Sequence, residues 1–477
     1  MLIWFIAIYL VLSLGIGVYA STRVNTSRDF VVAGRNLPLP IVTATVFATW
    51  FGAETVLGIS AVFVKDGLGG VVADPFGASM CLIIAGLFFA PLLYRMNLLT
   101  IGDYYRARYN PTVELIMTIC IMLSYLGWVA AQVTALGLVF NVVTGGSISL
   151  QTGMVIGVAV VLCYTIFGGM WSVALLDFVQ MTVIMAGMLL IAVLISDQVG
   201  GVGRVVSHAQ ESGKLQLLPS GGMEVWIPFA GALVTMMLGS IPQQDVFQRM
   251  TSAKSEKIAV RGTVLGGVLY FAFAFVPMFL AYSAILIDPK FFSDLIETDS
   301  QMVLPNLILN HTPLIAQVFF FGALLSAIMS TASATLLAPS VMFTENILKH
   351  LVFKQMGDKQ MLLTMRIIVL TFGIFVLWFA LNSESSIFHM VENAYKVTLV
   401  GAFVPLAFGL YWKRANNQGA LLSIVMGLGS WLSMEYLQPD TYWPPQLVGL
   451  LMSVTGMLSG SLLPNMLPRQ LAAHNKT

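Results

Sequence analysis

The chain has 477 residues, of which 58% are hydrophobic and only 9% are charged. A soluble domain carries about 25% charged residues, so this composition excludes a protein with a water-facing surface and points to the bilayer as its solvent. The formal net charge of +1 argues against a nucleic acid partner. The three cysteines all lie in apolar stretches and the five histidines are scattered, which predicts neither disulfides nor a metal-ligand cluster.

Apolar runs long enough to cross a bilayer follow one another along the chain. They predict an all-α integral membrane protein with about 13 transmembrane helices, near residues 2–20, 38–64, 70–95, 112–143, 149–170, 173–197, 225–249, 261–288, 313–349, 362–381, 386–411, 417–436 and 443–463. The first run has no basic start, so we expect a retained span rather than a cleaved signal peptide.

The basic residues predict the orientation of these spans. If the N-terminus lies outside, the outer loops hold only Lys65, Arg204, Lys214 and Lys290, and Lys396 lies within a span. All other lysines and arginines then fall on the inner side, as expected for cytoplasmic loops. We therefore expect a multi-pass protein of the plasma (inner) membrane with its N-terminus outside and its C-terminus in the cytoplasm.

The span 38–64 contains residues that weaken a helix. Its stretch ATWFGAETVLG, residues 48–58, places Gly52 and Gly58 among polar side chains in the middle of the apolar run. Glycine destabilises a helix interior. An unwound helix in a bilayer leaves backbone carbonyl groups that must find a partner or a cation.

A second interruption, GSIPQQ at residues 239–244, places Pro242 inside the span 225–249. Proline removes a backbone donor and clashes with the preceding turn. If the first span is an extra one, both breaks fall on the first helix of a five-helix half, residues 38–197 and 225–411. Inverted-repeat transporters have this arrangement, with the substrate near the bilayer midplane between broken helices.

The chain is thus expected to divide into five segments. They are an extra span and cytoplasmic loop (1–37), a first repeat (38–197), an external loop (198–224), a second repeat (225–411), and two further spans with a cytoplasmic tail (412–477).

The span 313–349 carries a stripe of hydroxyl groups. Ser326, Ser330, Ser333 and Ser340 lie on one helical face, with Thr331 beside them. The stripe has two interpretations at this point. It supplies oxygen ligands for sodium, or it allows close packing between helices, as small residues do in membranes.

These stretches together resemble the sodium:solute symporter family. The resemblance is carried by ATWFGAETVLG, FGGMWSVALLDFVQ (167–180), IPQQDVFQRMTSAKS (241–255) and GALLSAIMSTASATLLAPSVMFTENI (322–347), and more weakly by GLYWKRANNQGA (409–420). It implies a LeuT-type bundle of five plus five inverted-repeat helices, with the first and sixth core helices broken. The implied activity is sodium-coupled import of a small polar organic solute by alternating access, with Na+ as the coupling ion, no organic cofactor and no obligatory protein partner. The chain shows no hydrolytic or metal motif, and we do not expect an enzyme.

The resemblance also implies a main sodium site between the first and eighth core helices. Its ligands would be the carbonyl groups of Ala48, Phe51 and Ala327 and the hydroxyl groups of Ser330 and Thr331.

A second sodium, bound by Asp177, Ser330 and Ser333, stays open, because Ala334 stands where some members have a further hydroxyl group. Asp177 has two other interpretations, as a way-station for sodium leaving inward or as a protonated structural acid. A buried carboxylate in a membrane helix is costly and suggests a function.

Several polar and aromatic side chains are expected to face the midplane cavity and bind the solute: Trp50, Glu54, Thr55, Asp74, Trp128, Gln243, Gln244 and Lys396. The spacing is most similar to the choline-transporter branch, whose aromatic cage holds a quaternary ammonium. Trp50 and Trp128 match two cage positions, whereas Ala78 and Gln243 do not, so choline is not the expected substrate.

Lys396 has three interpretations, since an unpaired charge at the bilayer centre is costly. It forms a salt bridge to Glu392, Glu54 or Asp74, it anchors a substrate carboxylate, or its charge replaces a sodium. With an opposing acidic residue for an ammonium group, the second interpretation favours an amino acid, a betaine or another amine-bearing solute. The alternative to sodium coupling is proton-coupled or sodium-independent transport that uses Asp177, Glu54 or Lys396.

Overall fold

The computed structural model describes residues 2–352, 356–383, 387–437 and 441–464. Throughout these ranges the chain is built from helices, and β-pairing is limited to an isolated bridge between Leu37 and Ala253. The all-α prediction is confirmed. Residues 465–477 of the predicted segment 412–477 lie outside the described residues, as do Lys354, Arg469 and Lys476, which were predicted on the inner side.

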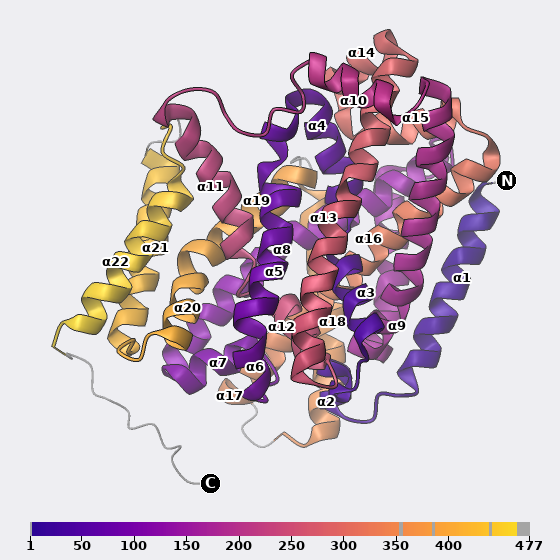
Figure 1. Cartoon of the computed structure of the whole chain (residues 1–477). Coiled ribbons are helices and arrows are strands. Elements are labelled where there is room, and N and C mark those ends of the chain that lie inside the picture. The colour runs from indigo at the N-terminus through magenta and orange to yellow at the C-terminus, as the bar shows by residue number, and fades with distance from the viewer. Residues whose placement is uncertain (1, 353–355, 384–386, 438–440, 465–477) are drawn as a thin grey trace.

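The first half of the core begins with the first broken helix, Leu39–Trp50 and Glu54–Asp66 (Figure 1). Its elements are α3 (Leu39–Trp50), η2 (Glu54–Ile59), α4 (Ser60–Asp66), η3 (Leu68–Val71), η4 (Val72–Gly77), α5 (Ala78–Ile84), η5 (Ala85–Phe89), α6 (Ala90–Arg95), α7 (Ile101–Arg108), α8 (Pro111–Val143) and α9 (Leu150–Val199).

The second half holds the second broken helix and the hydroxyl-bearing helix α16. Its elements are α11 (Met223–Gly239), α12 (Gln244–Ser252), α13 (Glu256–Ile287), α16 (Leu314–Met342), η7 (Phe343–Leu348), α17 (Lys349–Leu351), α18 (Asp358–Leu381), α19 (Ile387–Thr398), η8 (Leu399–Phe403) and α20 (Val404–Tyr411).

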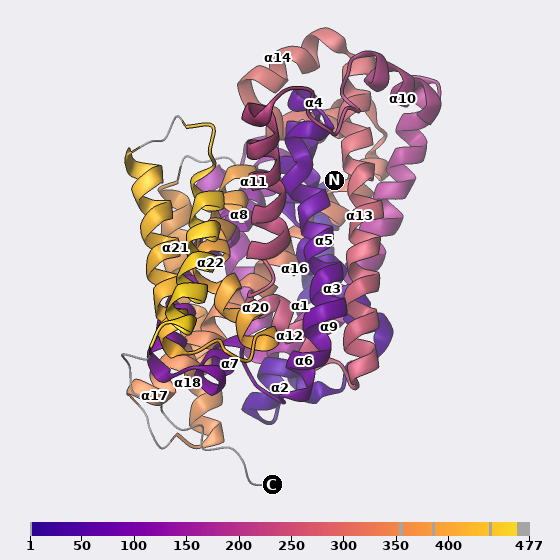
Figure 2. The ribbon, with the colours of Figure 1, turned by 60° about the vertical axis from the view of Figure 1, so that its left-hand side comes forward.

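The remaining helices surround this core or cover its ends. They are α1 (Leu2–Ser21), α2 (Ser27–Val32), η1 (Ala33–Arg35), α10 (Val202–Glu211), α14 (Pro289–Asp299), η6 (Ser300–Met302), α15 (Val303–His311), α21 (Asn417–Leu437) and α22 (Pro445–Leu462). Figure 2 shows α21 and α22 packed side by side at the edge of the bundle.

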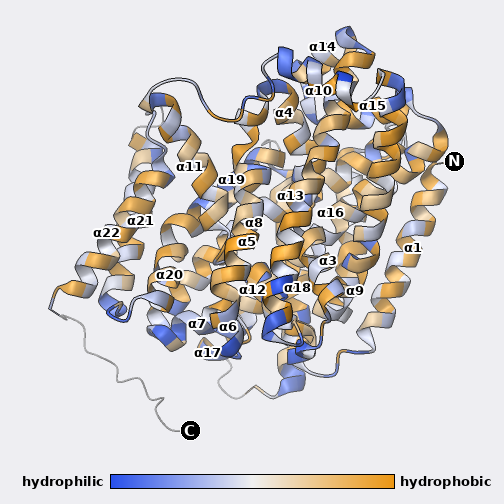
Figure 3. Cartoon of the chain, in the orientation of Figure 1, coloured by the Kyte–Doolittle hydropathy of each residue, from blue (hydrophilic) through white to orange (hydrophobic). Residues whose placement is uncertain are grey.

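Polar side chains gather at the two ends of the bundle, and apolar ones cover its middle. Figure 3 shows blue residues on α14 and α10 at one end and on α2, α7 and α17 at the other, with orange dominating between them. This banding is what a bilayer requires of the protein surface. The helix α1 begins near the first end, whereas α22 ends at the second (Figure 1).

Both predicted helix breaks are confirmed. The axis bends by 54° between α3 and the segment Glu54–Asp66, and by 46° between α11 and α12. Within the described part of the chain, these are the two bent helix pairs that are apolar and long enough to cross a membrane together, beside ten further candidate spans.

The predicted count of 13 spans depends on how α9 is divided. This helix has 50 residues and would be about 75 Å long if straight, more than twice the thickness of a bilayer core. The predicted spans 149–170 and 173–197 both lie in it. Within the described part of the chain the candidate spans number up to 12 in total when α9 counts as one, so the figure of 13 stays a prediction.

Gly169 is the point at which α9 kinks. Its φ of +47° and ψ of −138° are outside the helical region, and such a conformation is available to glycine at little cost. A Cβ atom at this position would lie 2.5 Å from the carbonyl oxygen of Phe30. The kink therefore depends on the missing side chain for both its backbone conformation and its contact with α2.

Replacement of Gly169 by alanine should destabilise the protein. Backbone strain costs about 1–3 kcal/mol, and the close contact with Phe30 adds to it, so we expect the melting temperature of the purified protein to fall by several degrees. The matched control is Gly322→Ala in α16, where a Cβ atom would meet nothing within 4 Å. Equal melting temperatures for the two variants would show that the kink is not a structural requirement.

Candidate functional site

The break in α3 is held open by side chains from other elements. Phe51 leaves the helical region, with φ −87° and ψ 72°. The Thr55 hydroxyl donates to the carbonyl oxygen of Trp50 at 3.1 Å, and the side-chain oxygen of Gln132 in α8 accepts the backbone N–H of Ala53 at 3.0 Å. These bonds replace helical ones that the break has removed, as a buried backbone requires.

The hydroxyl stripe of α16 meets the broken helix at Thr331. The Thr331 hydroxyl lies 2.8 Å from the carbonyl oxygen of Thr49, 3.5 Å from that of Ala48 and 3.2 Å from that of Ala327. Several oxygen atoms thus gather at one buried point between α3 and α16. Hard cations prefer such all-oxygen surroundings. Of the five residues predicted for the main sodium site, the structure directly brings Ala48, Ala327 and Thr331 together here.

Ser330, the next residue, turns its hydroxyl group toward α9. It donates to Asp177 Oδ1 at 2.6 Å, and the hydroxyl of Thr45 donates to the other carboxylate oxygen. Asp177 is completely buried and therefore ties α9 to both α3 and α16. Ser333, predicted beside it, donates to the carbonyl oxygen of Ser330 at 2.9 Å. Thr45 was missed by the sequence analysis.

Three aromatic rings form a cluster beside the break. The ring centroids of Trp50 and Trp128 are 5.7 Å apart, those of Trp50 and Tyr395 are 6.1 Å apart, and those of Trp128 and Tyr395 are 5.5 Å apart. The Trp50 indole nitrogen and the Tyr395 hydroxyl are buried with no hydrogen-bond partner in the described part of the chain. The sequence predicted the two tryptophans but not Tyr395, whose only signal was a polar group in an apolar span.

Glu54 lies at the edge of this ring cluster and is held by two neutral donors. Its carboxylate accepts the indole N–H of Trp128 at 3.0 Å and the amide N–H of Gln132 at 2.7 Å. Gln132 therefore contacts both the carboxylate and the broken backbone. It follows Trp128 by four residues on α8, and this spacing on one helical face was an available signal.

Asp74 is buried close to the same place and does not extend to external water. The hydroxyl of Tyr270 donates to its carboxylate and lies 3.0 Å from the Thr55 hydroxyl. Asp74 and Glu54 line one narrow pocket together with Glu392 and apolar residues. Two predicted carboxylates thus meet, and Tyr270 is an unpredicted member of the site.

The prediction that Lys396 faces the central cavity is wrong. Its ammonium nitrogen lies 3.9 Å from Glu435 Oε1 on α21, and not beside Glu392, Glu54 or Asp74, the three partners considered. Tyr395 occupies the helical face that contacts the tryptophans, so its neighbour in the sequence points to another side of α19.

The two glutamines of the second break differ in position. Gln243 donates to the Ser124 hydroxyl at 2.8 Å, one turn from Trp128 on α8. Gln244 instead accepts the backbone N–H of Ile101 at 2.8 Å and thereby caps the first turn of α7. Gln243 stays near the ring cluster, whereas the placement of Gln244 in the solute cavity is wrong.

A buried arginine links the two broken helices. Arg249 of α12 is 1% exposed, and its Nε donates to the Thr49 hydroxyl at 2.8 Å. The carboxylate of Asp245, one turn earlier, accepts the Tyr125 hydroxyl at 2.5 Å. The pattern of basic residues predicts Arg249 on the inner side of the membrane, whereas the bend at the second break places it in the protein interior.

Comparison with known proteins gives consistent matches over almost the whole chain. The model of the sodium:solute symporter family matches residues 30–427. High affinity choline transporter 1 of Homo sapiens is 28% identical over 471 residues, which covers 92% of this chain and 78% of that protein. The sodium/pantothenate symporter of Escherichia coli (strain K12) is 27% identical over 472 residues, and 96% of each chain is covered.

A solved structure of a Na+-coupled sialic acid symporter in a substrate-bound outward-open state has the same fold. The TM-score is 0.83 at 20% sequence identity, with 97% of each chain covered. This likeness, together with the two broken helices, agrees with the five-plus-five core expected from the sequence.

Loss of the Gln132 amide should be costly, because it satisfies both the Ala53 N–H and the Glu54 carboxylate. Gln132→Leu leaves two buried polar groups without this partner, at about 1–3 kcal/mol each, and we expect a lower melting temperature and weak solute uptake. The control is Thr118→Val in the same helix, since the buried Thr118 hydroxyl has no hydrogen-bond partner among the described residues and its loss should be neutral. Normal stability and uptake in Gln132→Leu would contradict this role.

Proposed function

Because the chain belongs to the sodium:solute symporter family, it is a transporter that couples Na+ to the symport of a small solute, and we propose where each of the two binds. Sodium binds between the break of α3 and α16, and the solute binds beside Glu54 and the ring cluster of Trp50, Trp128 and Tyr395. No enzymatic step is involved, in keeping with the family.

The sodium site is proposed mainly because the Thr331 hydroxyl lies close to carbonyl oxygens of both α3 and α16. Phe51 and Ser330 complete the proposed ligand set, because Phe51 lies at the break itself and Ser330 is adjacent to Thr331. On binding, the ion would draw the α3 carbonyl groups and the α16 hydroxyl groups together. Sodium binding and the ordering of the broken helix would therefore occur together. The ordered helix then positions the residues of the solute site.

Asp177 is proposed to form a second binding site for sodium, together with Ser330 and Ser333. Its carboxylate is close to the main site through the shared Ser330 hydroxyl. If a second ion binds there, Asp177→Asn should reduce the Hill coefficient of sodium activation of uptake to one. An unchanged coefficient above one would contradict a second sodium site at Asp177.

The charge of the narrow pocket supports an amine-bearing solute. Glu54, Asp74 and Glu392 line it, and none of the described residues that line it is basic. Aromatic faces beside a carboxylate attract an organic cation. Since Lys396 is turned to Glu435, the pocket supplies no basic side chain for a substrate carboxylate. The charge of the pocket lining therefore favours an amine without a carboxylate over the amino acid or betaine considered from the sequence.

We also propose that this protein lies in the plasma (inner) membrane, with the end bearing α10 and α14 outside and the end bearing α2 and α17 in the cytoplasm. The distribution of basic residues supports this orientation.

A cysteine introduced at Lys290 should react with an impermeant maleimide on intact cells, whereas one at Arg95 should not. The reverse pattern would show that the topology is opposite to the one proposed.

Removal of the hydroxyl groups at the proposed ion site should weaken sodium binding. Interactions with a charged group are worth about 1.5–3 kcal/mol, so Ser330→Ala and Thr331→Ala should each raise the sodium concentration for half-maximal uptake roughly 10- to 150-fold. Ser340→Ala is the control, because Ser340 is a buried serine of the same helix whose hydroxyl, among the described residues, donates only to the carbonyl oxygen of Leu336. Unchanged sodium activation in both variants would rule out this site.

A thermal-shift screen should identify the class of solute. Purified protein is heated with amines, diamines, betaines, amino acids, carboxylates and sugars, each in sodium and in potassium. A ligand of the native state raises the melting temperature by mass action. We expect shifts with amines that require sodium and disappear in Glu54→Gln, while sodium alone still stabilises that variant.

Two outcomes of the same screen would contradict the proposal. A sodium-dependent shift with a carboxylate or a sugar would reject the amine and leave the ion site intact. A shift indifferent to sodium, with uptake that rises at acid pH, would favour the proton-coupled alternative through Asp177 or Glu54.

A further inference from the structure

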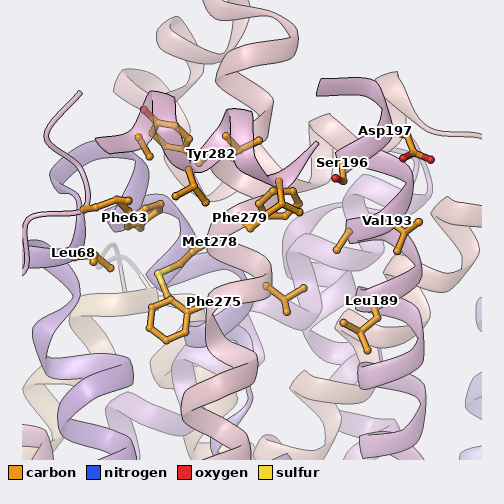
Figure 4. Close-up of a pocket in the computed structure, with 17 residues that line it drawn as sticks. Phe63, Leu68, Leu189, Val193, Ser196, Asp197, Phe275, Met278, Phe279 and Tyr282 are labelled. Atoms are coloured by element: carbon orange, nitrogen blue, oxygen red, sulfur yellow. The ribbon is translucent and has the colours of Figure 1, made fainter. Parts of the chain in front are cut away.

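A second, much larger pocket lies away from the ion and solute sites, near the end of the bundle that carries α10. It has a volume of about 500 Å³, is open on one side, and is lined by residues of α4, η3, α9, α10 and α13. Figure 4 shows Leu189 and Val193 of α9 on one side and Phe279 of α13 on the side that faces them, whereas the ring of Phe275 points away from α9.

The lining of this pocket is almost wholly apolar. Ser196 and Asp197 stand at one edge, at the end of α9, and the hydroxyl of Tyr282 is already engaged by His208 Nδ1 at 3.0 Å. A polar solute would find few partners here, and an apolar cavity of this kind does not hold ordered water. The apolar lining therefore favours a hydrocarbon ligand over a polar solute.

The pocket is continuous with the lipid-facing surface of the protein. Leu189 and Val193 on α9 are 48% and 60% exposed, and Val202 and Val206 on α10 are 53% and 45% exposed. All four line the pocket. The two on α9 belong to a candidate membrane span, which presents such residues to acyl chains, so the lipid-facing surface of α9 extends into the pocket.

The helix α10 covers the pocket at its outer end. Val205 and Ala209 are buried on its inner side and line the pocket. Arg204 is exposed, whereas His208 points inward to Tyr282. Arg204 donates to the carbonyl oxygen of Val199 at 3.3 Å, and Val199 follows Asp197 of the pocket edge by two residues. A lipid headgroup held at this level would meet one basic and one acidic side chain.

From these features we propose that the pocket binds one acyl chain of a membrane phospholipid. The chain enters sideways between α9 and α13, beneath α10, and the headgroup stays at the edge formed by Ser196 and Asp197. This site is separate from the solute site and takes a ligand of a different class, because its walls are apolar where those of the solute site are acidic and aromatic.

The bound chain would lie against the outer part of the first broken helix. Phe63 of α4 lines the pocket and contacts Tyr282 of α13, with ring centroids 5.9 Å apart. The lipid thus packs on the same helix whose inner part provides the proposed sodium ligands.

Photo-crosslinking tests the proposal on the full-length purified protein. The probe is a phosphatidylcholine with a diazirine near the end of one acyl chain, added at a low mole fraction to micelles. The adducts are located by peptide mass spectrometry. We expect labelling of Leu189–Asp197 and Phe275–Tyr282 to exceed that of the exposed apolar face of α18 by about tenfold, equivalent to a preference of about 1.4 kcal/mol.

A variant whose new side chain fills the pocket distinguishes labelling at this site from labelling by the surrounding lipid. Ala192 lines the pocket, and Ala192→Phe should remove most of the preferential labelling while α18 is labelled as before. Ala7→Phe, a matched change on α1 outside the pocket, should leave the labelling unchanged. Equal labelling of the pocket and α18 in the wild-type protein would overturn the proposal without need of any variant. Labelling by a diazirine fatty acid but not by the phosphatidylcholine would also overturn it, in favour of a free fatty acid.

Discussion

The arrangement of this protein depends on one constraint, that a backbone polar group within a bilayer must find a partner inside the protein. A continuous helix meets this requirement by itself, but α3 is interrupted after Trp50. The missing bonds come from Thr55, which follows the break, and from Gln132 and Thr331, which belong to α8 and α16. The break is therefore stable only while these helices are packed around it, and the oxygen atoms it leaves form a natural place for a small cation.

The buried charges around the break are held mainly by neutral groups. Glu54 accepts from an indole and an amide, Asp177 accepts from two hydroxyl groups, and Arg249 donates to a hydroxyl and a carbonyl. Neutral partners reduce the cost of burying a charge but do not cancel the charge. A carboxylate in this situation keeps its attraction for a cation, and the proposed sodium and amine sites both use that attraction.

The first broken helix separates two kinds of environment. Its middle faces carbonyl oxygens, hydroxyl groups and carboxylates, whereas Phe63, on its outer part, faces the apolar pocket proposed for a lipid chain. A solute that leaves water must have its polar groups matched, while an acyl chain needs only apolar contact. The same helix can therefore contact two ligands of opposite chemistry with no competition between them.

The sequence by itself determined that the chain crosses a membrane many times and that two of its helices are broken, because composition, apolar run length and residues such as Gly52 and Pro242 act locally. A role for the hydroxyl groups of Ser330 and Thr331 in sodium binding could also be predicted from the sequence, through the resemblance to a family. Tertiary structure alone decided which side chains meet at the site. Tyr395 joins the tryptophans and Lys396 turns to α21, and the difference between these adjacent residues depends on which helix packs against each face of α19, a relation between segments far apart in the sequence.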